Sequence, residues 1–476
     1  MTATIPFHVP PANPVIVDVS DVCLHLNNGL ALGGIVRVIT QIIRHTDWRE
    51  GRGGVTLVFF HPAQHRYVRL DPALFADDRC LDRHHFNRAT GMTGIRMKTA
   101  SRRYMDRPLR RAWHLFRRGL KRRIRAVGEY LVPPRGVLGW AISPWTMPSE
   151  GRCVVAVLGM AWLLPEQIAR LRALASRPGV EVVPLIHDLI PIVAPASEPK
   201  PNLAFVHWFG EMASLANRYV TISHHSAADI RGVLGSRSGQ PPRIDRVPLA
   251  HSFDWDGHVD PSLVPDGEYV LSVGSIAHAR KNLLALIDVW GRIGARIGTE
   301  RLPTLVIAGD HDGKARQIDE LLQRHPMLRE RLRLVRKPSD QQLAALYSAC
   351  LFSIFPSLYE GWGLPLGESA SFGRLCLSSR VTSLSEVLGE AIDYFDPTSL
   401  DDMISCIERP ILDRAYLKRR EEGLRTLPLR SWRMVARELF ATLAQHENAI
   451  ELVGAGPGAG PFHAVPVAQT ATSLAG

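Results

Sequence analysis

The chain has 476 residues, of which 46% are apolar and 22% are charged. At roughly 100 to 200 residues per domain, this length predicts two or three domains. The composition excludes a single small binding module and a disordered or fibrous chain. The longest near-continuous apolar run, 153–164, is shorter than the roughly 20 residues that a membrane-spanning helix needs. The first residues lack the basic start and apolar core of a signal peptide, so we expect a cytoplasmic protein.

The cysteines give no sign of a metal site or a disulfide framework. None belongs to a CxxC pair, and most stand in apolar surroundings, which is typical of buried thiols. The six are Cys23, Cys80, Cys153, Cys350, Cys376 and Cys406.

The positive charge of the chain is concentrated in one segment. Residues 96–125 contain thirteen Lys or Arg and one acid, Asp106, which gives this segment a net charge of +12. The total is +11, so the remainder of the chain carries about −1 and is nearly neutral. An anionic partner is therefore expected to dock on this segment.

The same segment, 96–127, has the pattern of a basic amphipathic helix. Apolar residues recur there at helical spacing, and basic residues fill much of the remaining circumference. Such a helix either lies on an anionic membrane or packs its apolar stripe into the core, and the sequence leaves both readings open. Nucleic acid is not expected as a partner, because no recognition motif accompanies the charge. The apolar positions are Leu109, Trp113, Phe116, Leu120, Ile124 and Val127.

Short apolar runs alternate with helical stretches along both halves of the chain. This alternation is typical of parallel, doubly wound sheets. The first half is expected to form strands at 15–19, 55–60, 154–158, 182–186 and 219–222. The second half is expected to form strands at 269–273, 304–308, 332–335, 351–355 and 375–378, and helices at 283–293, 314–323, 340–350 and 364–372.

A stretch rich in Gly, Pro, Ser and Asp, 235–267, separates the two series and reads as a connection. We therefore expect an α/β protein with two tandem Rossmann-like domains that face each other across a cleft. Ligands of such sheets bind beyond the carboxyl ends of the strands, so the chemistry is expected in the loops that follow strands. The expected division is a first domain at 1–250, a linker at 251–267, a second domain at 268–430, a C-terminal helix at 431–453 and a disordered tail at 454–476.

The most informative of these loops is 355–373, which follows an apolar strand and leads into a helix. Pro365 suits the first turn of that helix, which places Gly361 and Gly363 in the turn before it. The unbonded N–H groups near Gly363 and Leu364 then face the cleft at the positive end of the helix. This arrangement predicts a diphosphate site.

Two glutamates flank this turn. Glu368 stands one helical turn further on, where a carboxylate suits neutral hydroxyls such as those of a ribose, and Glu360 stands where a carboxylate can bind hydroxyls of a sugar. The spacing of these two glutamates is weak evidence for a binding site by itself, because a helix cap beside a solvated glutamate gives the same pattern. A pair of catalytic carboxylates in a glycoside hydrolase is a further alternative.

Glu360 and Glu368, with GWGLPLG between them, resemble the Glu-(seven residues)-Glu motif of the retaining, GT-B-fold glycosyltransferases of family four. The resemblance covers most of 13–444 and is more specific in the second half than before Val182. The basic segment has no counterpart in it. Other matching stretches are GGIVRVITQII (33–43), LIHDLIP (185–191), TISHHSAADI (221–230), YVLSVGSIAHARKNLLALIDVW (269–290), LVIAGD (305–310), LAALYSACLFSIFPS (343–357) and SLSEVLGEAIDYFDP (383–397).

The resemblance implies roles for a pair of cations. Without a metal ion, side chains and backbone dipoles must neutralise the leaving diphosphate, and Arg280 and Lys281 are placed for this. The family usually has a cation directly after the glycine of the first donor-domain strand. Here Ser275 follows Gly274, so only Lys281 matches and Arg280 is the candidate replacement. A solvated helix start is the alternative reading for Arg280 and Lys281.

Three residues of the first half complete the candidate site. Gly33 and Gly34 precede a helix and can let the backbone approach the donor phosphate, although an ordinary turn has the same pattern. His187 ends a buried strand, where the family's histidine contacts the donor sugar or the reaction centre. A core or turn histidine is the alternative. Asp188 is expected to orient the loop.

Two Asp-x-Asp sequences, 254–256 and 310–312, are interpreted as turns and not as a metal site, because neither has the surroundings of a metal-binding transferase motif. No metal and no cofactor are therefore expected.

The expected function is the metal-independent transfer of a sugar, with retention, from a nucleotide diphosphate donor, with GDP-mannose as the leading guess. The donor is expected to bind mainly the second domain, 268–430, and the acceptor is expected to meet the first domain, 1–250. The expected acceptor is a saccharide or a polyprenyl-linked saccharide of a bacterial surface polysaccharide. The basic segment 96–127 is expected to hold the protein on the anionic inner face of the membrane. The alternative from another class is a catalytically silent, membrane-associated partner that binds a nucleotide sugar.

Overall fold

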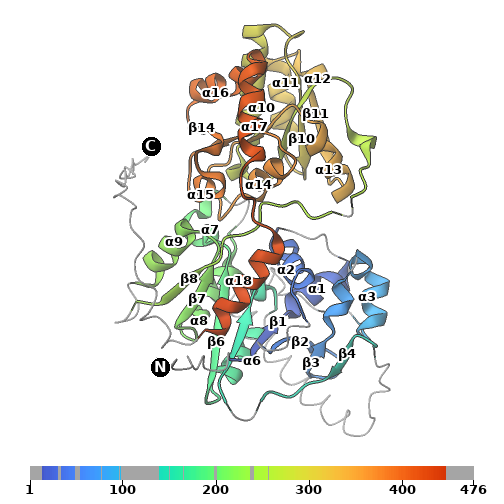
Figure 1. Cartoon of the computed structure of the whole chain (residues 1–476), viewed down its shortest axis with the longest axis vertical. Helices are drawn as coiled ribbons and strands as arrows, with labels where there is room; N and C mark the ends of the chain where they lie inside the picture. The colour runs from blue at the N-terminus through green and yellow to red at the C-terminus, as the bar shows by residue number, and fades with distance from the viewer. Residues whose placement is uncertain are drawn as a thin grey trace, which may run out of the picture.

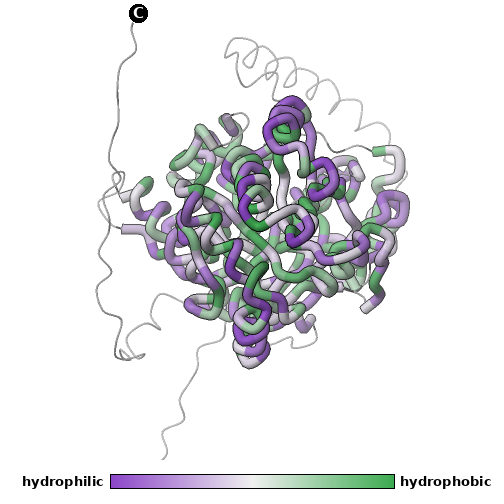
Figure 2. The backbone as a smooth tube through the Cα atoms, turned by 90° about the horizontal axis from the view of Figure 1, so that it is seen from above, coloured by the Kyte–Doolittle hydropathy of each residue, from purple (hydrophilic) through white to green (hydrophobic). Residues whose placement is uncertain are grey.

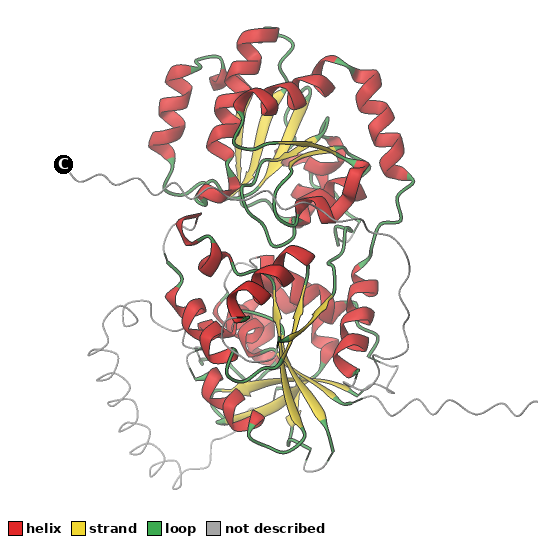
Figure 3. Cartoon of the chain, turned by 90° about the vertical axis from the view of Figure 1, so that its left-hand side faces the viewer, coloured by secondary structure: helices red, strands yellow, loops and turns green. Residues whose placement is uncertain are grey.

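The computed structural model shows two α/β bodies stacked along the long axis of the molecule, each with helices on both faces of one sheet (Figure 1, Figure 3). Apolar segments gather in the interior, and the outer helices carry more polar residues (Figure 2). No helix among the described residues is long and apolar enough to cross a membrane. The structure describes residues 13–29, 34–48, 54–76, 78–95, 97, 139–148, 151–164, 166–197, 201–235, 241–255 and 257–445.

The first body is built on an eight-stranded sheet with the order β4-β3-β2-β1-β5-β6-β7-β8. Its central pairs are parallel as predicted, but β3 is antiparallel to both β2 and β4. The sheet is therefore mixed at one edge. The strands are β1 (Val15–Asp18), β2 (Val55–His61), β3 (Arg66–Leu70), β4 (Ile142–Pro144), β5 (Cys153–Val157), β6 (Val180–Ile186), β7 (Arg218–Thr221) and β8 (Arg243–Arg246).

All five strands expected in this half are present, and three more were missed. The sequence RIDR of β8 lies inside the stretch 235–267 that we interpreted as a connection, so that interpretation is wrong at β8. Strand β8 has a single apolar residue, β4 has three residues, and in β3 two arginines interrupt the apolar residues. Edge strands need fewer apolar side chains because one side or face is solvated, and the apolar signal is correspondingly weak.

The helices around this sheet come from both ends of the chain. The last of them, α18, packs against α2, β1 and β5 of the first body, so the chain crosses back after the second body (Figure 1). The buried Arg218 guanidinium donates to the Gln445 carbonyl at 3.1 Å and to the Asp245 carboxylate at 2.7 Å. It thereby satisfies carbonyls at the end of α18. The helices are α1 (Ser20–Asn28), α2 (Gly34–Arg44), α3 (Arg83–Ala89), α6 (Gln167–Ala175), α7 (Ile190–Val193), α8 (Leu203–Met212), α9 (His224–Leu234) and α18 (Trp432–Ala444).

The second body has a six-stranded, wholly parallel sheet with the order β11-β10-β9-β12-β13-β14. The strand order reverses between β9 and β12, and in such sheets the ligand site lies at the carboxyl ends of the strands at that point. The strands are β9 (Tyr269–Val273), β10 (Thr304–Gly309), β11 (Leu332–Arg336), β12 (Ser353–Phe355), β13 (Cys376–Ser379) and β14 (Asp393–Phe395).

The five strands and four helices expected in this half are confirmed to within a few residues, and β14 was missed. Its three residues, DYF, are too short to stand out as an apolar run. The helices are α10 (Leu283–Ile297), α11 (Ala315–Arg324), α12 (Leu328–Arg331), α13 (Asp340–Ala349), α14 (Leu364–Ser371), α15 (Leu384–Leu388), α16 (Leu400–Leu412) and α17 (Arg414–Arg425).

Candidate functional site

The loop between β12 and α14 forms the turn that the glycines and proline predict. Gly363 caps α14 with a φ of +120°, and a Cβ there would lie 2.5 Å from a Leu384 methyl, so only glycine fits. Helix α14 begins at Leu364, with Pro365 in its first turn. Its N-terminal N–H groups therefore lie at the carboxyl end of the sheet, as a phosphate site requires.

Glu360 in this loop is held between two cations. The short 3₁₀ helix Ala279–Lys281 follows β9, and it places Arg280 Nη1 2.7 Å from Glu360 Oε2 and Lys281 Nζ 2.6 Å from Glu360 Oε1. Burial acts to raise the pKa of Glu360, but the charges of Lys281 and Arg280 outweigh it, so the pKa lies below its usual value. Glu360 is thus a fixed carboxylate. Three residues predicted to bind different parts of a donor form one ion cluster.

Gly274 and Ser275 lie in the turn after β9. A Cβ at the neighbouring Gly309 would be 2.0 Å from the Gly274 carbonyl oxygen, so the two turns are in tight contact. Ser275 donates its hydroxyl to the Asp310 carbonyl at 3.1 Å. Ser275 therefore fastens the turn and leaves the positive charge at this point to Arg280 and Lys281.

Glu368 lies in the second turn of α14 and is also buried. Its Oε2 accepts a hydrogen bond of 2.9 Å from the Tyr347 hydroxyl. Burial raises the pKa of Glu368, while the charge of Arg37 and the Tyr347 bond oppose that rise. Arg37 belongs to α2 of the first body and pairs with Asp340 at 3.1 Å. The surroundings of Glu368 therefore include both bodies.

His187 follows β6 directly, and its ring Nε2 lies 2.9 Å from the Leu158 carbonyl, to which it donates. Burial lowers the pKa of His187 to about 4, against a smaller raising effect of this bond. The ring is therefore neutral at pH 7, with Nδ1 as an acceptor. A Cβ at position 361 would lie 2.5 Å from the His187 carbonyl oxygen, so Gly361 lets the Glu360 loop touch the His187 loop of the other body.

Gly33 and Gly34 are the remaining predicted site residues of the first half. Gly33 lies outside the described residues. Gly34 is the first residue of α2, and no atom lies within 4 Å of the place where its Cβ would be. Its predicted contact with a donor phosphate stays a prediction.

The Asp-x-Asp sequences are occupied by ion pairs. Asp310 lies 3.3 Å from Lys337 and Asp312 lies 2.6 Å from Arg336. Arg336 is the last residue of β11, and Lys337 follows it. Asp254 contacts His45 at 3.2 Å, and Asp256 lies outside the described residues. Among the residues that the structure describes, no group of three or more His, Cys, Asp or Glu is arranged to hold a metal ion.

An inter-body contact at α9 was missed by sequence reasoning. The Glu386 carboxylate of the second body accepts from the backbone N–H groups of His224 at 2.7 Å and His225 at 2.9 Å, at the N-terminus of α9. Beside it, the Tyr359 hydroxyl donates to Asp229 at 2.6 Å and lies 2.9 Å from His225 Nε2. We call this the α9 contact. Ser223, an N-cap residue before an apolar helix, signals the helix start but not its partner.

Parts of the chain are similar to known proteins. Residues 267–413 match the family model described as Glycosyl transferases group 1, which covers the second sheet from β9 to β14. The chain is 32% identical to a serotype-specific mannosyltransferase, WbdA, of Escherichia coli over 155 residues, which is 33% of this chain and 19% of that protein. It is 26% identical to an O-antigen chain mannosyltransferase B of Escherichia coli over 244 residues, 49% of this chain and 62% of that protein.

The solved structure of a sucrose-phosphate synthase from Thermosynechococcus elongatus superposes with a TM-score of 0.54 at 17% identity and covers 90% of this chain and 100% of that one. At this identity the likeness concerns the fold. The chain spans about a fifth of the length of the first of the mannosyltransferases named above. The chain thus has the two-domain GT-B fold, and residues 267–413 of its second domain match the glycosyl transferases group 1 model.

Proposed function

We propose that this protein is a glycosyltransferase of polysaccharide biosynthesis that moves a sugar from a nucleotide diphosphate donor to a saccharide acceptor. The observation that carries the proposal is the Arg280–Glu360–Lys281 ion cluster beside the N-terminus of α14, at the reversal point of the second sheet. The group 1 domain and the mannosyltransferase relatives support the same activity.

The proposed chemistry follows from the hydrogen-bond donors that the site presents to a phosphate. As the bond from the sugar to the diphosphate breaks, negative charge develops on the leaving phosphate. A lysine ammonium has three N–H donors and an arginine guanidinium has five, so Lys281 and Arg280 can bond to Glu360 and to phosphate oxygens at the same time. The N–H groups at the start of α14 add a positive dipole. These groups take the place of a metal ion in the proposed mechanism.

Finer assignments belong to the same proposal. Glu368 binds the ribose of the nucleotide, Arg280 and Lys281 bind the diphosphate, and Glu360 and His187 face the transferred sugar. GDP-mannose is the proposed donor because two of the relatives are named mannosyltransferases. We propose retention at the anomeric carbon. A hydrolase is disfavoured, since Glu360 and Glu368 belong to separate contact groups and the glycine turn with its helix start suits a phosphate.

The test is nucleotide release from a panel of GDP- and UDP-sugars with saccharide and polyprenyl-linked acceptors, with and without EDTA. We expect release with GDP-mannose, unchanged by EDTA, and an α-linked product by NMR. Loss of turnover on chelation, restored by a divalent ion, would overturn the metal-free mechanism. Tight nucleotide binding without turnover on any acceptor would identify a silent binding partner.

The basic segment 96–127 lies, apart from Met97, outside the described residues, so its membrane role remains part of the proposal. We propose that it holds the protein on the anionic, cytoplasmic face of the membrane. Cosedimentation with anionic vesicles should weaken with rising salt and fall by orders of magnitude when six basic residues become Gln. Equal binding of the substituted protein would reject this role. The six are Arg110, Arg111, Arg117, Arg118, Lys121 and Arg122.

A further inference from the structure

The turn between β13 and α15 is bonded to the backbone of the Glu360 loop. The Glu360 N–H donates to Thr382 Oγ1 at 3.1 Å, and the Ser383 hydroxyl donates to the Glu360 carbonyl at 2.8 Å. Ser383 also donates to the Trp362 carbonyl at 3.2 Å. Both backbone polar groups of Glu360 are thus bonded to side chains that stand 22 and 23 positions further along the chain.

Thr382 has a backbone conformation that threonine rarely adopts. Its φ is +48°, in the left-handed region, where a β-branched side chain is strained. Among the described residues, three others that are not glycine have a positive φ, and none of them is β-branched. They are His65, Asn282 and Lys337. Strain of this kind persists only where surrounding contacts fix the backbone, and the Thr382 hydroxyl is bonded to the Glu360 loop.

Ser383 also departs from the local pattern. It is the N-cap residue of α15, yet its side chain makes no cap hydrogen bond. At the other helices of the described chain that begin after a serine, the serine side chain accepts from a backbone N–H of the first turn. These serines are Ser223, Ser339, Ser399 and Ser431. The buried Ser383 hydroxyl contacts Glu360 instead, so two neighbouring residues both forgo a locally favourable arrangement and contact the same residue.

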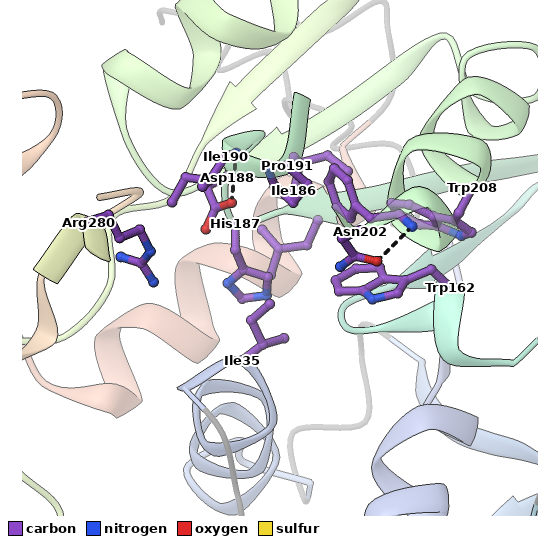
Figure 4. Close-up of a pocket in the computed structure, with 12 residues that line it drawn as sticks. Ile35, Trp162, Ile186, His187, Asp188, Ile190, Pro191, Asn202, Trp208 and Arg280 are labelled. Atoms are coloured by element: carbon purple, nitrogen blue, oxygen red, sulfur yellow. Dashed lines mark hydrogen bonds between the residues drawn. The ribbon is translucent and has the colours of Figure 1, made fainter. Parts of the chain in front are cut away.

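The backbone position of Glu360 determines whether both cations reach its carboxylate. Arg280 and Lys281 approach from a different loop, at 2.7 Å and 2.6 Å. A displacement of Glu360 by about 1 Å would lengthen at least one of these contacts, and a misplacement of this size can lower a reaction rate about a hundredfold. Arg280 also lines a pocket with His187 and Asp188 of the first domain, so the ion cluster borders a space that a substrate can enter (Figure 4).

We propose that Thr382 and Ser383 are positioning residues that hold Glu360 in place between Arg280 and Lys281. Thr382 fixes the N–H side of Glu360 and Ser383 fixes its carbonyl side, so the Cα that carries the carboxylate is held from both sides. The expected effect on sugar transfer rests on the proposed function, whereas the fixing of the loop does not. A positioning role differs from a purely structural one, because relief of the strain at Thr382 should spare the fold and still impair transfer.

The experiment uses the full chain and Thr382→Gly. Glycine adopts this φ without strain but lacks the hydroxyl that accepts from Glu360. We expect a melting temperature within about 4 °C of the wild type and faster hydrogen exchange in peptides that contain Glu360. We also expect kcat to fall by about tenfold to a hundredfold with nearly unchanged affinity for GDP.

Two further variants and a control sharpen this test. Thr382→Ser keeps the hydroxyl and should retain the slow exchange and the kcat of the wild type. Ser383→Ala removes the donor on the carbonyl side and should lower kcat as Thr382→Gly does. His65→Gly is the matched control, since His65 has the same φ of +48° in the exposed turn between β2 and β3, and it should leave exchange at Glu360 and kcat unchanged.

The outcomes separate this inference from the proposed function. Wild-type exchange and wild-type kcat in Thr382→Gly would overturn the role of Thr382, and wild-type kcat in Ser383→Ala would overturn that of Ser383. A kcat that falls together with a large drop in melting temperature, and is not retained in Thr382→Ser, would identify a role in folding alone and overturn positioning. Faster exchange in Thr382→Gly but not in Thr382→Ser supports the placement of Glu360, and absence of nucleotide release by the wild type from any donor would then count against the proposed function alone.

Discussion

The loop before α14 and the second turn of α14 each hold one buried glutamate, and the two differ in their partners. Glu360 is 7% exposed and contacts two cations, whereas Glu368 is 8% exposed and contacts a neutral tyrosine hydroxyl. The pKa of Glu360 is lowered and that of Glu368 is raised. Burial is nearly equal, so the adjacent charges decide the direction of the pKa shift.

Because their partners differ, Glu360 and Glu368 are expected to have different roles. Glu360, in the loop before α14, is an anion that keeps Arg280 and Lys281 together. Glu368 lacks an adjacent cation within ion-pair distance among the described residues, so it can take a neutral partner such as a hydroxyl pair. The predictions below test this contrast, in order of decreasing effect.

Removal of the Glu360 charge should have the largest effect. In Glu360→Gln, Arg280 and Lys281 stay buried beside a neutral amide, and breaking a buried ion pair in this way costs about 3–5 kcal/mol. We expect a lower melting temperature and a loss of sugar transfer. Glu390→Gln, at a side chain that is 82% exposed, is the control and should leave the melting temperature unchanged. An unchanged melting temperature in Glu360→Gln would show that the cluster does not contribute to stability.

His187 extends the contrast to a buried ring whose bonded partner is the neutral Leu158 carbonyl. Its pKa in the folded protein is about 4, below the usual 6.5, so the unfolded chain binds a proton more readily between these pH values. Stability should therefore fall as the pH drops from about 6.5 to 4, by about 3 kcal/mol for a shift of this size. His187→Gln should lack this contribution. The measurement is the free energy of unfolding in urea at several pH values, for the wild type and for His187→Gln. Parallel pH profiles of the two proteins would contradict this prediction.

Glu368 should affect nucleotide binding more than stability. Glu368→Gln removes the charged acceptor proposed for the ribose, and a hydrogen bond to a charged group contributes about 1.5–3 kcal/mol. Calorimetry with GDP should show affinity lower by about tenfold to a hundredfold. Tyr347→Phe, which removes only the hydroxyl bonded to Glu368, is the companion variant and should retain GDP binding. Equal GDP affinity in Glu368→Gln and the wild type would reject the ribose role.

The α9 contact should give the smallest effect. Glu386→Ala leaves the N-terminus of α9 without its carboxylate, an interaction that contributes about 0.3–1 kcal/mol at an accessible helix end. Because the adjacent Tyr359 precedes Glu360, we expect a modest loss of transfer with a nearly normal melting temperature. Glu386→Asp keeps the negative charge but shortens the side chain, so it tests whether the carboxylate must reach the N–H groups of α9. Full activity in Glu386→Ala would show that the contact does not position the Glu360 loop.

Local signals in the sequence determined much of the second domain. Apolar runs of four or more residues predicted β9 and β10 almost to the residue, since both faces of a parallel sheet are covered. The glycines and Pro365 predicted the turn and start of α14, because these residues act on the backbone within a few positions. Glu360 was likewise found by its place in the loop after a strand, whereas Arg280 and Lys281 were found through the family resemblance.

Only the tertiary structure decided how these residues meet. Lys281 and Glu360 stand 79 positions apart, and the fit of Gly361 against His187 joins two domains, so no local pattern reports either contact. The edge strand β8 and the return of α18 to the first domain depend on the surfaces already formed by other elements. The contact between Trp162 and Trp208 arises in the same way, since these residues belong to different elements and meet through packing. The sequence determines which chemical groups the chain carries. Which of these groups come within contact distance of one another is decided by the fold, because their positions in the sequence are far apart.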